Sequence, residues 1–239
     1  MSAVAPPGGP LRYRARRVQE TVPTTEAGPV PASRPVGGAA KRALDLAVAV
    51  PAAIVLAPVI AGVALWVRSD SPGPAIFRQR RIGAFGRPFT VLKFRSMVVG
   101  AQDIGRGLAV AEDDDRITRA GRILRRLSLD ELPQLVNVIL GDMSLVGPRP
   151  TVASQVERYD AVQRRRLLAR PGVTGLAQVR GRAAIPWSQR IAIDVEYVNS
   201  WSMALDLRVL AQTVRVILGG EDAYRGEGAG FDLPERADV

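Results

Sequence analysis

Two adjacent carboxylates, Asp130 and Glu131, are the residues best placed to do chemistry in this sequence. The 239-residue chain has no Cys and no His, which excludes thiolate or imidazole zinc sites, haem ligation by those residues, and Ser-His-Asp or Cys-His catalysis. A nucleophile or base must therefore be a carboxylate, a Lys, a Tyr or a hydroxyl. A metal ion would need oxygen ligands, which favours Mg²⁺.

The carboxylate pair has a structural as well as a chemical interpretation. Ser128 and Glu131 have the S-x-x-E spacing of a capping box, which would simply begin a helix, although Pro133 then lies deep in the first turn. In the chemical interpretation, helix amides and nearby arginines hold a phosphate beside the pair. One carboxylate could then attack phosphorus while the other holds Mg²⁺. Both interpretations fit the pattern.

Other charged residues have weaker signals. Lys93 and Arg95 flank an aromatic residue at the end of a predicted strand, which suits a phosphate or a solvated strand face. Arg149 stands between two prolines, which fix its backbone and lower the entropy cost of presenting its guanidinium, but the same motif is often a rigid turn. Arg182 ends a glycine-punctuated loop that could hold a diphosphate. Asp115 closes a run of three acids, a pattern that is usually solvated.

Several short elements must position these residues. Alternating stretches at residues 75–79 and 88–94 predict a β-hairpin. Apolar spacing predicts a basic amphipathic helix over 116–127, a helix over 132–140, and two further amphipathic helices within 189–218. The basic helix is expected to meet lipid head groups or a lipid-linked phosphate. The predicted fold is mainly α with a small β-hairpin, in the α+β class.

Residues 46–67 form an uncharged run of 22 residues. A straight helix of that length would span about 33 Å, close to a hydrocarbon core of about 30 Å. However, Pro51 and Pro58 interrupt the run, and both flanks are basic, so the positive-inside rule asks both ends to be cytoplasmic. A bent, re-entrant helix satisfies that rule; a spanning helix and a buried core helix are the alternatives.

The domain plan follows from these segments. Residues 1–40 are expected to be a disordered basic tail, 41–68 the membrane helix, 69–218 a catalytic domain, and 219–239 a flexible tail. The net charge of +10 indicates anionic partners. A nucleic-acid-binding protein would use this charge and the run Arg164-Arg165-Arg166. That alternative leaves the apolar run unexplained, and aromatic residues make up only 5% of the chain.

Taken in order, these segments resemble the bacterial sugar transferase family, the monotopic phosphoglycosyl transferases. The resemblance covers about residues 41–218. Besides the proline-broken run, the matching segments are Lys41-Arg42-Ala43-Leu44-Asp45, residues 73–79, 93–97, 115–118 and 128–134, Asp142 through Pro150, and Pro171-Gly172-Val173-Thr174-Gly175. So many ordered motifs at similar spacing make the resemblance far more specific than any single one.

The resemblance implies a two-step transfer of a sugar phosphate from a UDP-sugar to a polyprenyl phosphate such as undecaprenyl phosphate. Asp130 matches the nucleophile, which would attack the β-phosphate, release UMP and hold the sugar phosphate covalently. Glu131 matches the partner carboxylate associated with Mg²⁺. Arg125 matches an arginine near the lipid phosphate, and Arg149 matches the Pro-Arg-Pro loop. We expect Lys93, Arg95 and Arg182 to contact substrate phosphates as well.

The resemblance also implies a re-entrant helix broken at Pro58, interfacial amphipathic helices, and a catalytic domain on the cytoplasmic face of the bacterial inner membrane. The expected partners are the UDP-sugar, the lipid acceptor and membrane lipids, but no nucleic acid; a homodimer is compatible with the sequence without being specified by it. The chain departs from the family pattern at Ala57, Leu176 and Arg180, where Ser, Trp and Asn are frequent. An inactive scaffold with the same fold is the remaining alternative.

Overall fold

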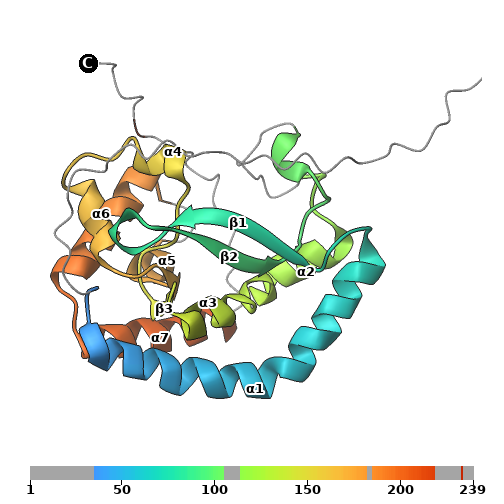
Figure 1. The fold of residues 1–239 in the computed structure, drawn as a ribbon, viewed down its shortest axis with the longest axis horizontal. Coiled ribbons are helices and arrows are strands. Elements are labelled where there is room, and N and C mark those ends of the chain that lie inside the picture. The colour runs from blue at the N-terminus through green and yellow to red at the C-terminus, as the bar shows by residue number, and fades with distance from the viewer. Residues whose placement is uncertain (1–34, 105–113, 182–184, 219–232, 234–239) are drawn as a thin grey trace, which may run out of the picture.

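The computed structural model describes residues 35–104, 114–181, 185–218 and 233. Figure 1 shows the long helix α1 curving beneath a body of short helices and a β-hairpin. The helices and strands are α1 (Gly38–Asp70), β1 (Ile76–Ile82), β2 (Pro88–Phe94), α2 (Arg119–Arg126), α3 (Gln134–Leu140), β3 (Ser144–Val146), α4 (Ala153–Val156), β4 (Gly172–Thr174), α5 (Leu176–Arg180), α6 (Trp187–Asn199) and α7 (Met203–Leu218). Short 3-10 turns are η1 (Ala84–Gly86), η2 (Ala101–Asp103), η3 (Leu129–Glu131) and η4 (Gln163–Leu168). The predicted mainly helical fold with a small hairpin is confirmed.

The hairpin has the predicted position, with β1 longer than expected. Its strands pair antiparallel from Ile76 opposite Phe94 to Ile82 opposite Pro88. Directly opposite residues point to the same face of a sheet, so Arg81 and Lys93 share the face that contains the buried Val91. A second, parallel pair of strands, β3 with β4, was not predicted. Each has only three residues, which is too short for a hydrophobic pattern to reveal.

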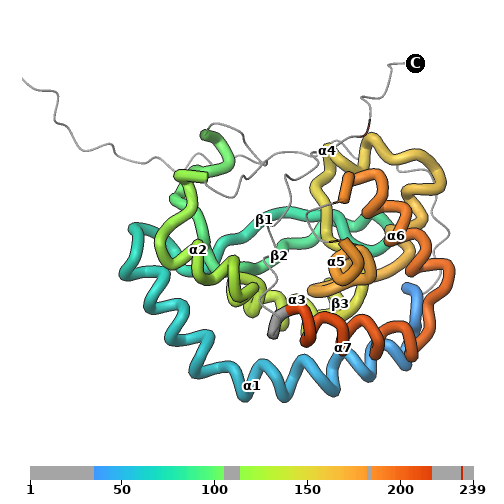
Figure 2. The backbone as a smooth tube through the Cα atoms, turned by 180° about the vertical axis from the view of Figure 1, so that it is seen from behind, coloured from blue at the N-terminus to red at the C-terminus, as the bar shows by residue number. Residues whose placement is uncertain are grey.

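Helix α1 continues through both Pro51 and Pro58. Figures 1 and 2 show that it runs along the bottom of the molecule and then turns away from that line. We attribute the bend to the prolines, because each lacks an N–H donor and its ring crowds the preceding turn. Only 11% of the most apolar stretch of α1 is buried. The alternative of a buried core helix is therefore wrong, since such a helix would be mostly covered.

The first turns of α1 are fixed to the body of the protein. Arg42 donates to the carbonyl oxygens of Val138 and Ile139 near the end of α3, at 2.5 and 2.7 Å. The buried Asp45 accepts hydrogen bonds through Oδ1 from the Ser144 hydroxyl and the Leu145 amide, at 2.8 and 2.9 Å. These contacts explain why the first turns of this otherwise apolar helix contain a cation and a carboxylate.

A buried ion pair joins the start of α1 to α7. Lys41 Nζ lies 2.5 Å from Asp206 Oδ2, and neither side chain is more than 2% exposed. Tyr197 and Trp201 also donate to the Asp206 carboxylate, at 2.7 and 3.2 Å. The carboxylate therefore has three protein donors, which offsets the cost of burying its charge.

The other end of α1 is fixed to the same body. The Arg95 guanidinium donates to the carbonyl oxygens of Ser71 and Pro74, at 2.8 and 2.7 Å, just beyond the last turn. Asp70 accepts from the amide of Ala120 in α2, at 3.0 Å. Both ends of α1 thus contact one globular unit, while its middle turns expose Ile54, Val55 and Leu65 by 70–74%.

Candidate active site

The site forms around the turn η3, between α2 and α3. Ser128 has a positive φ of 56°, an uncommon conformation for a residue with a side chain, and it reverses the chain so that the next residues enter η3. Its hydroxyl makes no cap hydrogen bond. The capping-box interpretation is therefore wrong: the Glu131 side chain is directed to other partners.

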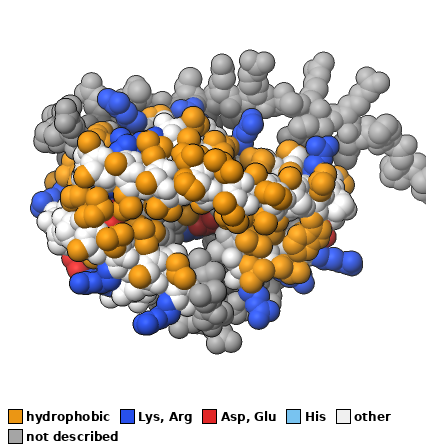
Figure 3. Space-filling view, turned by 90° about the horizontal axis from the view of Figure 1, so that it is seen from below, with side chains coloured by type: hydrophobic (Ala, Val, Ile, Leu, Met, Phe, Trp, Pro, Cys, Tyr) orange, Lys and Arg blue, Asp and Glu red, His pale blue; other side chains and the backbone are white. Residues whose placement is uncertain are grey.

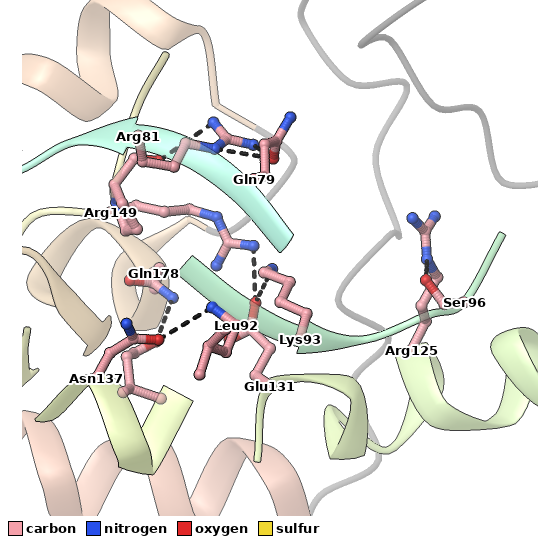
Figure 4. Close-up of polar contacts among 12 residues, drawn as sticks. Gln79, Arg81, Leu92, Lys93, Ser96, Arg125, Glu131, Asn137, Arg149 and Gln178 are labelled. Carbon is pink, nitrogen blue, oxygen red and sulfur yellow. Dashed lines mark hydrogen bonds and ion pairs between the residues drawn. The ribbon is translucent and has the colours of Figure 1, made fainter. Parts of the chain in front are cut away.

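Glu131 joins two cations from distant segments (Figure 4). Its Oε1 lies 2.7 Å from Lys93 Nζ on β2 and 2.9 Å from Arg149 Nη2 in the loop after β3. Burial by itself raises the pKa of Glu131, but the charges of Arg149 and Lys93 outweigh it and lower the pKa to about 2. Glu131 is therefore a fixed anion at neutral pH.

The Asp130 carboxylate differs from that of Glu131 both in its partners and in the direction of its pKa shift. It is 9% exposed, and within the described residues its carboxylate has neither a hydrogen bond nor an ion pair closer than 4 Å. Burial, and next the negative charge of Glu131, raise the pKa of Asp130 to about 6, although nearby cations oppose this. A carboxylate with a raised pKa and no hydrogen-bond partner is more basic and less solvated than usual, which suits a nucleophile.

A cavity of about 390 Å³ opens beside this pair. Its lining includes Asp130, Glu131, Arg125, Arg149 and residues of α3, β4, α5, α6 and α7. Figure 3 shows the face along which α1 runs: hydrophobic side chains form a broad band, and acidic side chains are visible in a hollow within it. The volume lies at the lower end of the range that is usual for small-molecule sites.

Arg125 lines the cavity from the last turn of α2. Its Nε donates to the hydroxyl of Ser96 at 2.8 Å, which fixes the side chain on the side of the cavity away from Arg149 (Figure 4). Gly121 permits this packing, since a Cβ there would lie 2.0 Å from the carbonyl oxygen of Ser96. Arg125 and Arg149 thus approach the carboxylates from two directions.

The Arg149 loop is held by tight backbone contacts. A Cβ at Gly147 would lie 2.2 Å from the carbonyl oxygen of Arg170, so only glycine allows β3 and β4 to pair this closely. Arg166 Nη2 donates to the carbonyl oxygen of Arg149 at 3.0 Å, and the same guanidinium forms a buried ion pair with Asp194 at 2.5 Å. The proposed nucleic-acid run therefore includes one buried, structural arginine.

The structure does not bring every predicted phosphate-binding residue to the cavity. Arg95 is 4% exposed and its guanidinium is used at the end of α1, so it holds a helix terminus. Arg116, predicted on the basic face of a helix, is buried and paired with Asp114 at 2.6 Å. Asp115 is exposed and does not line the cavity. Arg182 lies outside the described residues.

Sequence reasoning missed two residues that shape the site. Arg81 lies beside Arg149, and both line a smaller opening of about 30 Å³ together with Lys93 and Glu131. Asn137 accepts from the Leu92 amide at 3.0 Å and donates to the Thr90 carbonyl at 2.8 Å, which fixes β2 against α3. The hairpin register would place Arg81 on the Lys93 face, but nothing in the sequence alone specified that register.

The two departures from the family pattern in this region have structural partners. Leu176 is buried in the core beside β3, and Arg180 pairs with Glu196 at the surface at 2.7 Å. Neither lines the cavity, although Gln178 between them does. Their effect on the donor site would therefore be indirect.

The carboxylate pair fits a magnesium ion of the type that binds substrate phosphates. Within the described residues there is no cluster of three or more acidic side chains, which excludes a cage built from protein carboxylates there. Mg²⁺ commonly uses one or two carboxylates, substrate phosphates and water. Both contacts of Glu131 go to Oε1, so Oε2 and the Asp130 carboxylate remain as oxygen ligands.

Comparison with known proteins gives one consistent match. A family model described as bacterial sugar transferase matches residues 36–220. A UDP-glucose:undecaprenyl-phosphate glucose-1-phosphate transferase of Caulobacter vibrioides is 46% identical over 77% of this chain and 72% of its own length. The exopolysaccharide production protein ExoY of Sinorhizobium fredii is 39% identical over 81% and 92%. An undecaprenyl-phosphate galactose phosphotransferase of Salmonella typhimurium is 40% identical over 77% and 41%.

Proposed function

Because this chain belongs to the bacterial sugar transferase family, we propose that it transfers a sugar 1-phosphate from a UDP-sugar to undecaprenyl phosphate during polysaccharide synthesis. The observation that carries the proposal is the state of Asp130, a cavity-lining carboxylate without a hydrogen-bond partner among the described residues. Its neighbour Glu131 takes the ion pairs of Lys93 and Arg149. One carboxylate is thereby left available for attack.

In the first step, an oxygen of Asp130 bonds to the β-phosphorus of the donor. The bond from that phosphorus to the bridging oxygen breaks, and UMP leaves with the electron pair. A carboxylate is a weak nucleophile, so positioning and charge neutralisation by Lys93 and Arg149 must supply most of the rate. A Mg²⁺ ion held by Glu131 would add charge neutralisation on the donor phosphates.

In the second step, an oxygen of the lipid phosphate attacks the same phosphorus and displaces Asp130. The product is a polyprenyl-diphosphate sugar, and the carboxylate is regenerated. Arg125 would hold the lipid phosphate; its position in the cavity lining, on the side away from Arg149, supports this role. The broad apolar band on the face along which α1 runs would hold a membrane-bound acceptor against the protein.

The arrangement of α1 supports a re-entrant helix in the cytoplasmic membrane. Its two ends contact one globular body, through Arg42 and Asp45 at the start and Asp70 at the end. A helix that crossed the bilayer would put its ends on opposite sides, where one body could not hold both. The bend at the prolines and the exposed apolar middle are consistent with a helix that enters and leaves on the cytoplasmic side.

The reaction is tested by UMP release. Membranes containing the protein would receive undecaprenyl phosphate, Mg²⁺ and a panel of donors that includes UDP-glucose and UDP-galactose. Wild type should release UMP in a lipid-dependent way and Asp130→Asn should not, while Asp115→Asn, an acid-to-amide change outside the cavity, should remain active. Quenched reactions should carry the phosphosugar on Asp130 by mass spectrometry. Its detection on another residue, or an active Asp130→Asn variant, would refute the assignment.

A further inference from the structure

Arg81 is a half-buried arginine that faces another arginine. It lies on β1 beside Arg149, and among the residues that the structure describes it has no ion pair with a carboxylate. Two buried arginines named above, Arg116 and Arg166, each pair with an aspartate, and a third, Arg95, donates to backbone carbonyl oxygens. Burial, and next the charge of Arg149, lower the pKa of Arg81 to about 10. Two guanidinium groups held together in this way favour an anion between them.

The Arg81 guanidinium is held by hydrogen bonds that leave some of its N–H donors unused within the described residues. Nε and Nη2 donate to Oε1 of Gln79, at 2.9 and 2.6 Å, and Nη1 approaches the carbonyl oxygen of Pro150 at 3.4 Å. A guanidinium has five N–H donors. Three are used, so two remain without an acceptor among the described residues. A neutral amide thus orients this cation without neutralising it, which is what an anion-binding arginine requires.

The opening beside Arg81 has the size and lining for phosphate oxygens. It measures about 30 Å³ and is lined by Arg81, Arg149, Lys93 and Glu131. One water needs roughly 10–15 Å³, so the opening takes phosphate oxygen atoms but not a sugar ring. Arg149 and Glu131 also line the large cavity. The two spaces therefore meet at the carboxylate pair.

We propose that Arg81 binds the phosphate of the departing nucleotide, with Arg149 between it and the reacting phosphorus. This inference rests on the proposed function. In-line attack by Asp130 places the leaving oxygen on the far side of the β-phosphorus. When the bond from the β-phosphorus to the bridging oxygen breaks, that oxygen keeps the electron pair and the nucleotide phosphate gains one negative charge. Arg81 and Arg149 lie where that charge would appear.

The test compares nucleotide binding in variants of the full chain held in nanodiscs of phosphatidylethanolamine and phosphatidylglycerol. The variants are Arg81→Gln, Arg81→Lys and Arg80→Gln. Arg80 lies on the same strand but is exposed on the opposite face, so its change removes the same charge away from the site. UMP and uridine binding are measured by the shift each causes in Tm, and by inhibition of UMP release. KM is measured for the UDP-sugar and for undecaprenyl phosphate.

Arg81→Gln should weaken UMP binding roughly tenfold to a hundredfold, because a charged hydrogen bond is lost, while uridine binding and the KM for the lipid stay unchanged. Arg81→Lys should fall between wild type and Arg81→Gln, and Arg80→Gln should match wild type. If Arg81→Gln does not fold, Arg81→Lys must still lower the ratio of UMP to uridine affinity.

Unchanged UMP binding in folded Arg81 variants would overturn the inference. A raised KM for the lipid with unchanged UMP binding would also overturn it, and would assign Arg81 to the acceptor phosphate. Either result, obtained with a wild type that releases UMP, leaves the proposed reaction intact. A wild type that releases no UMP from any donor and binds none would refute the reaction and the role of Arg81 together.

Discussion

Asp130 and Glu131 are neighbours in the sequence whose charges have opposite consequences for the fold. Glu131 has two cations within 2.9 Å and a pKa lowered to about 2. Asp130 is buried without a partner among the described residues, and its pKa is raised to about 6. The first carboxylate stabilises the folded protein at neutral pH, and the second destabilises it. Strain of this kind is common at functional sites.

Asp130→Asn should therefore raise the stability of the metal-free protein while it abolishes activity. The folded pKa lies above the unfolded value, so the stability that Asp130 provides in its protonated form is lost as pH rises through about 6. Removal of the charge should stabilise the protein on the order of 1–3 kcal/mol at pH 7.5, and the gain should vanish below about pH 4. Thermal unfolding in a chelator at both pH values checks this; an equal effect at both would contradict it.

Glu131→Gln should have the opposite effect under the same conditions. The folded pKa lies below the unfolded value, so the stability is present above about pH 4.5 and is lost as pH falls through about 2. The variant leaves Lys93 and Arg149 without their shared anion and should lose on the order of 1–3 kcal/mol at pH 7.5. A variant as stable as wild type would show that the two ion pairs contribute nothing.

At the scale of single residues, the sequence predicted which residues belong to the site better than it predicted which groups they contact. The motifs singled out Asp130, Glu131, Lys93 and Arg149, and the structure brings these four together. Arg95 has the same local pattern as Lys93, but it lies just past the end of β2, and its guanidinium donates to carbonyl oxygens beyond the end of α1. A cation beside an aromatic residue does not reveal whether it will contact a ligand or a helix end. Only the tertiary contacts do.

At the scale of elements, the fixed ends of α1 make its topology testable. The native chain has no cysteine, so a single introduced thiol can be labelled without background. Ala39→Cys and Ser69→Cys lie at exposed positions near the two ends of α1. In intact cells, a membrane-impermeant maleimide should label neither variant. In inside-out vesicles it should label both, because a re-entrant helix keeps both ends on the cytoplasmic side.

A spanning helix gives a different pattern. One of the two positions would then react in intact cells and the other in inside-out vesicles. A thiol at the exposed surface residue Val162, introduced as Val162→Cys, serves as the control for access to the globular body. Protection of both end positions in both preparations would instead mean that neither end of α1 reaches water.

The ion pair between α1 and α7 should be costly to break. Lys41→Met leaves the Asp206 carboxylate buried with only its two neutral donors, and should lower stability by about 3–5 kcal/mol. The double variant Lys41→Met/Asp206→Leu removes both charges and should recover a large part of that loss. Thermal unfolding in detergent measures both. A single variant with wild-type stability would mean that the pair does not hold α1 in place.

Elements with strong periodicity were predicted well, and elements set by tertiary contacts were not. The apolar run, the hairpin and the helices α3, α6 and α7 follow from local pattern. The strands β3 and β4 exist because two distant glycine-containing segments pack closely at Gly147 and Gly172. The turn at Ser128 adopts a conformation that its residue type disfavours. Such features depend on the packed fold, so the local pattern of residues 128–131 left a capping box open beside the chemical interpretation.

At the scale of the molecule, we expect the exposed apolar face of α1 to contribute more to membrane attachment than the net positive charge does. The exposed apolar residues of α1 form a continuous part of the face seen in Figure 3. Ile54→Lys/Val55→Lys should detach the protein from membranes, since each buried charge costs about 2.5–3.5 kcal/mol. Wild type and Val162→Lys should stay bound through high-salt and alkaline carbonate washing. Release of wild type by salt alone would favour a purely electrostatic attachment.

The pairing of Lys41 with Asp206 also has a consequence for biosynthesis. The two residues are 165 positions apart, so the ribosome makes α1 long before its partner on α7 exists. Until then the Lys41 charge lacks its buried partner, although the segments that α1 contacts through Arg42, Asp45 and Asp70 have already been made. Closure of the domain is then a late, non-local event, which is slow for a chain of this topology. A chain that ends before α7 would therefore lack the buried ion pair at the start of α1 while it keeps the contacts with α2, α3 and β3, and we expect it to be more susceptible to proteolysis than the full chain.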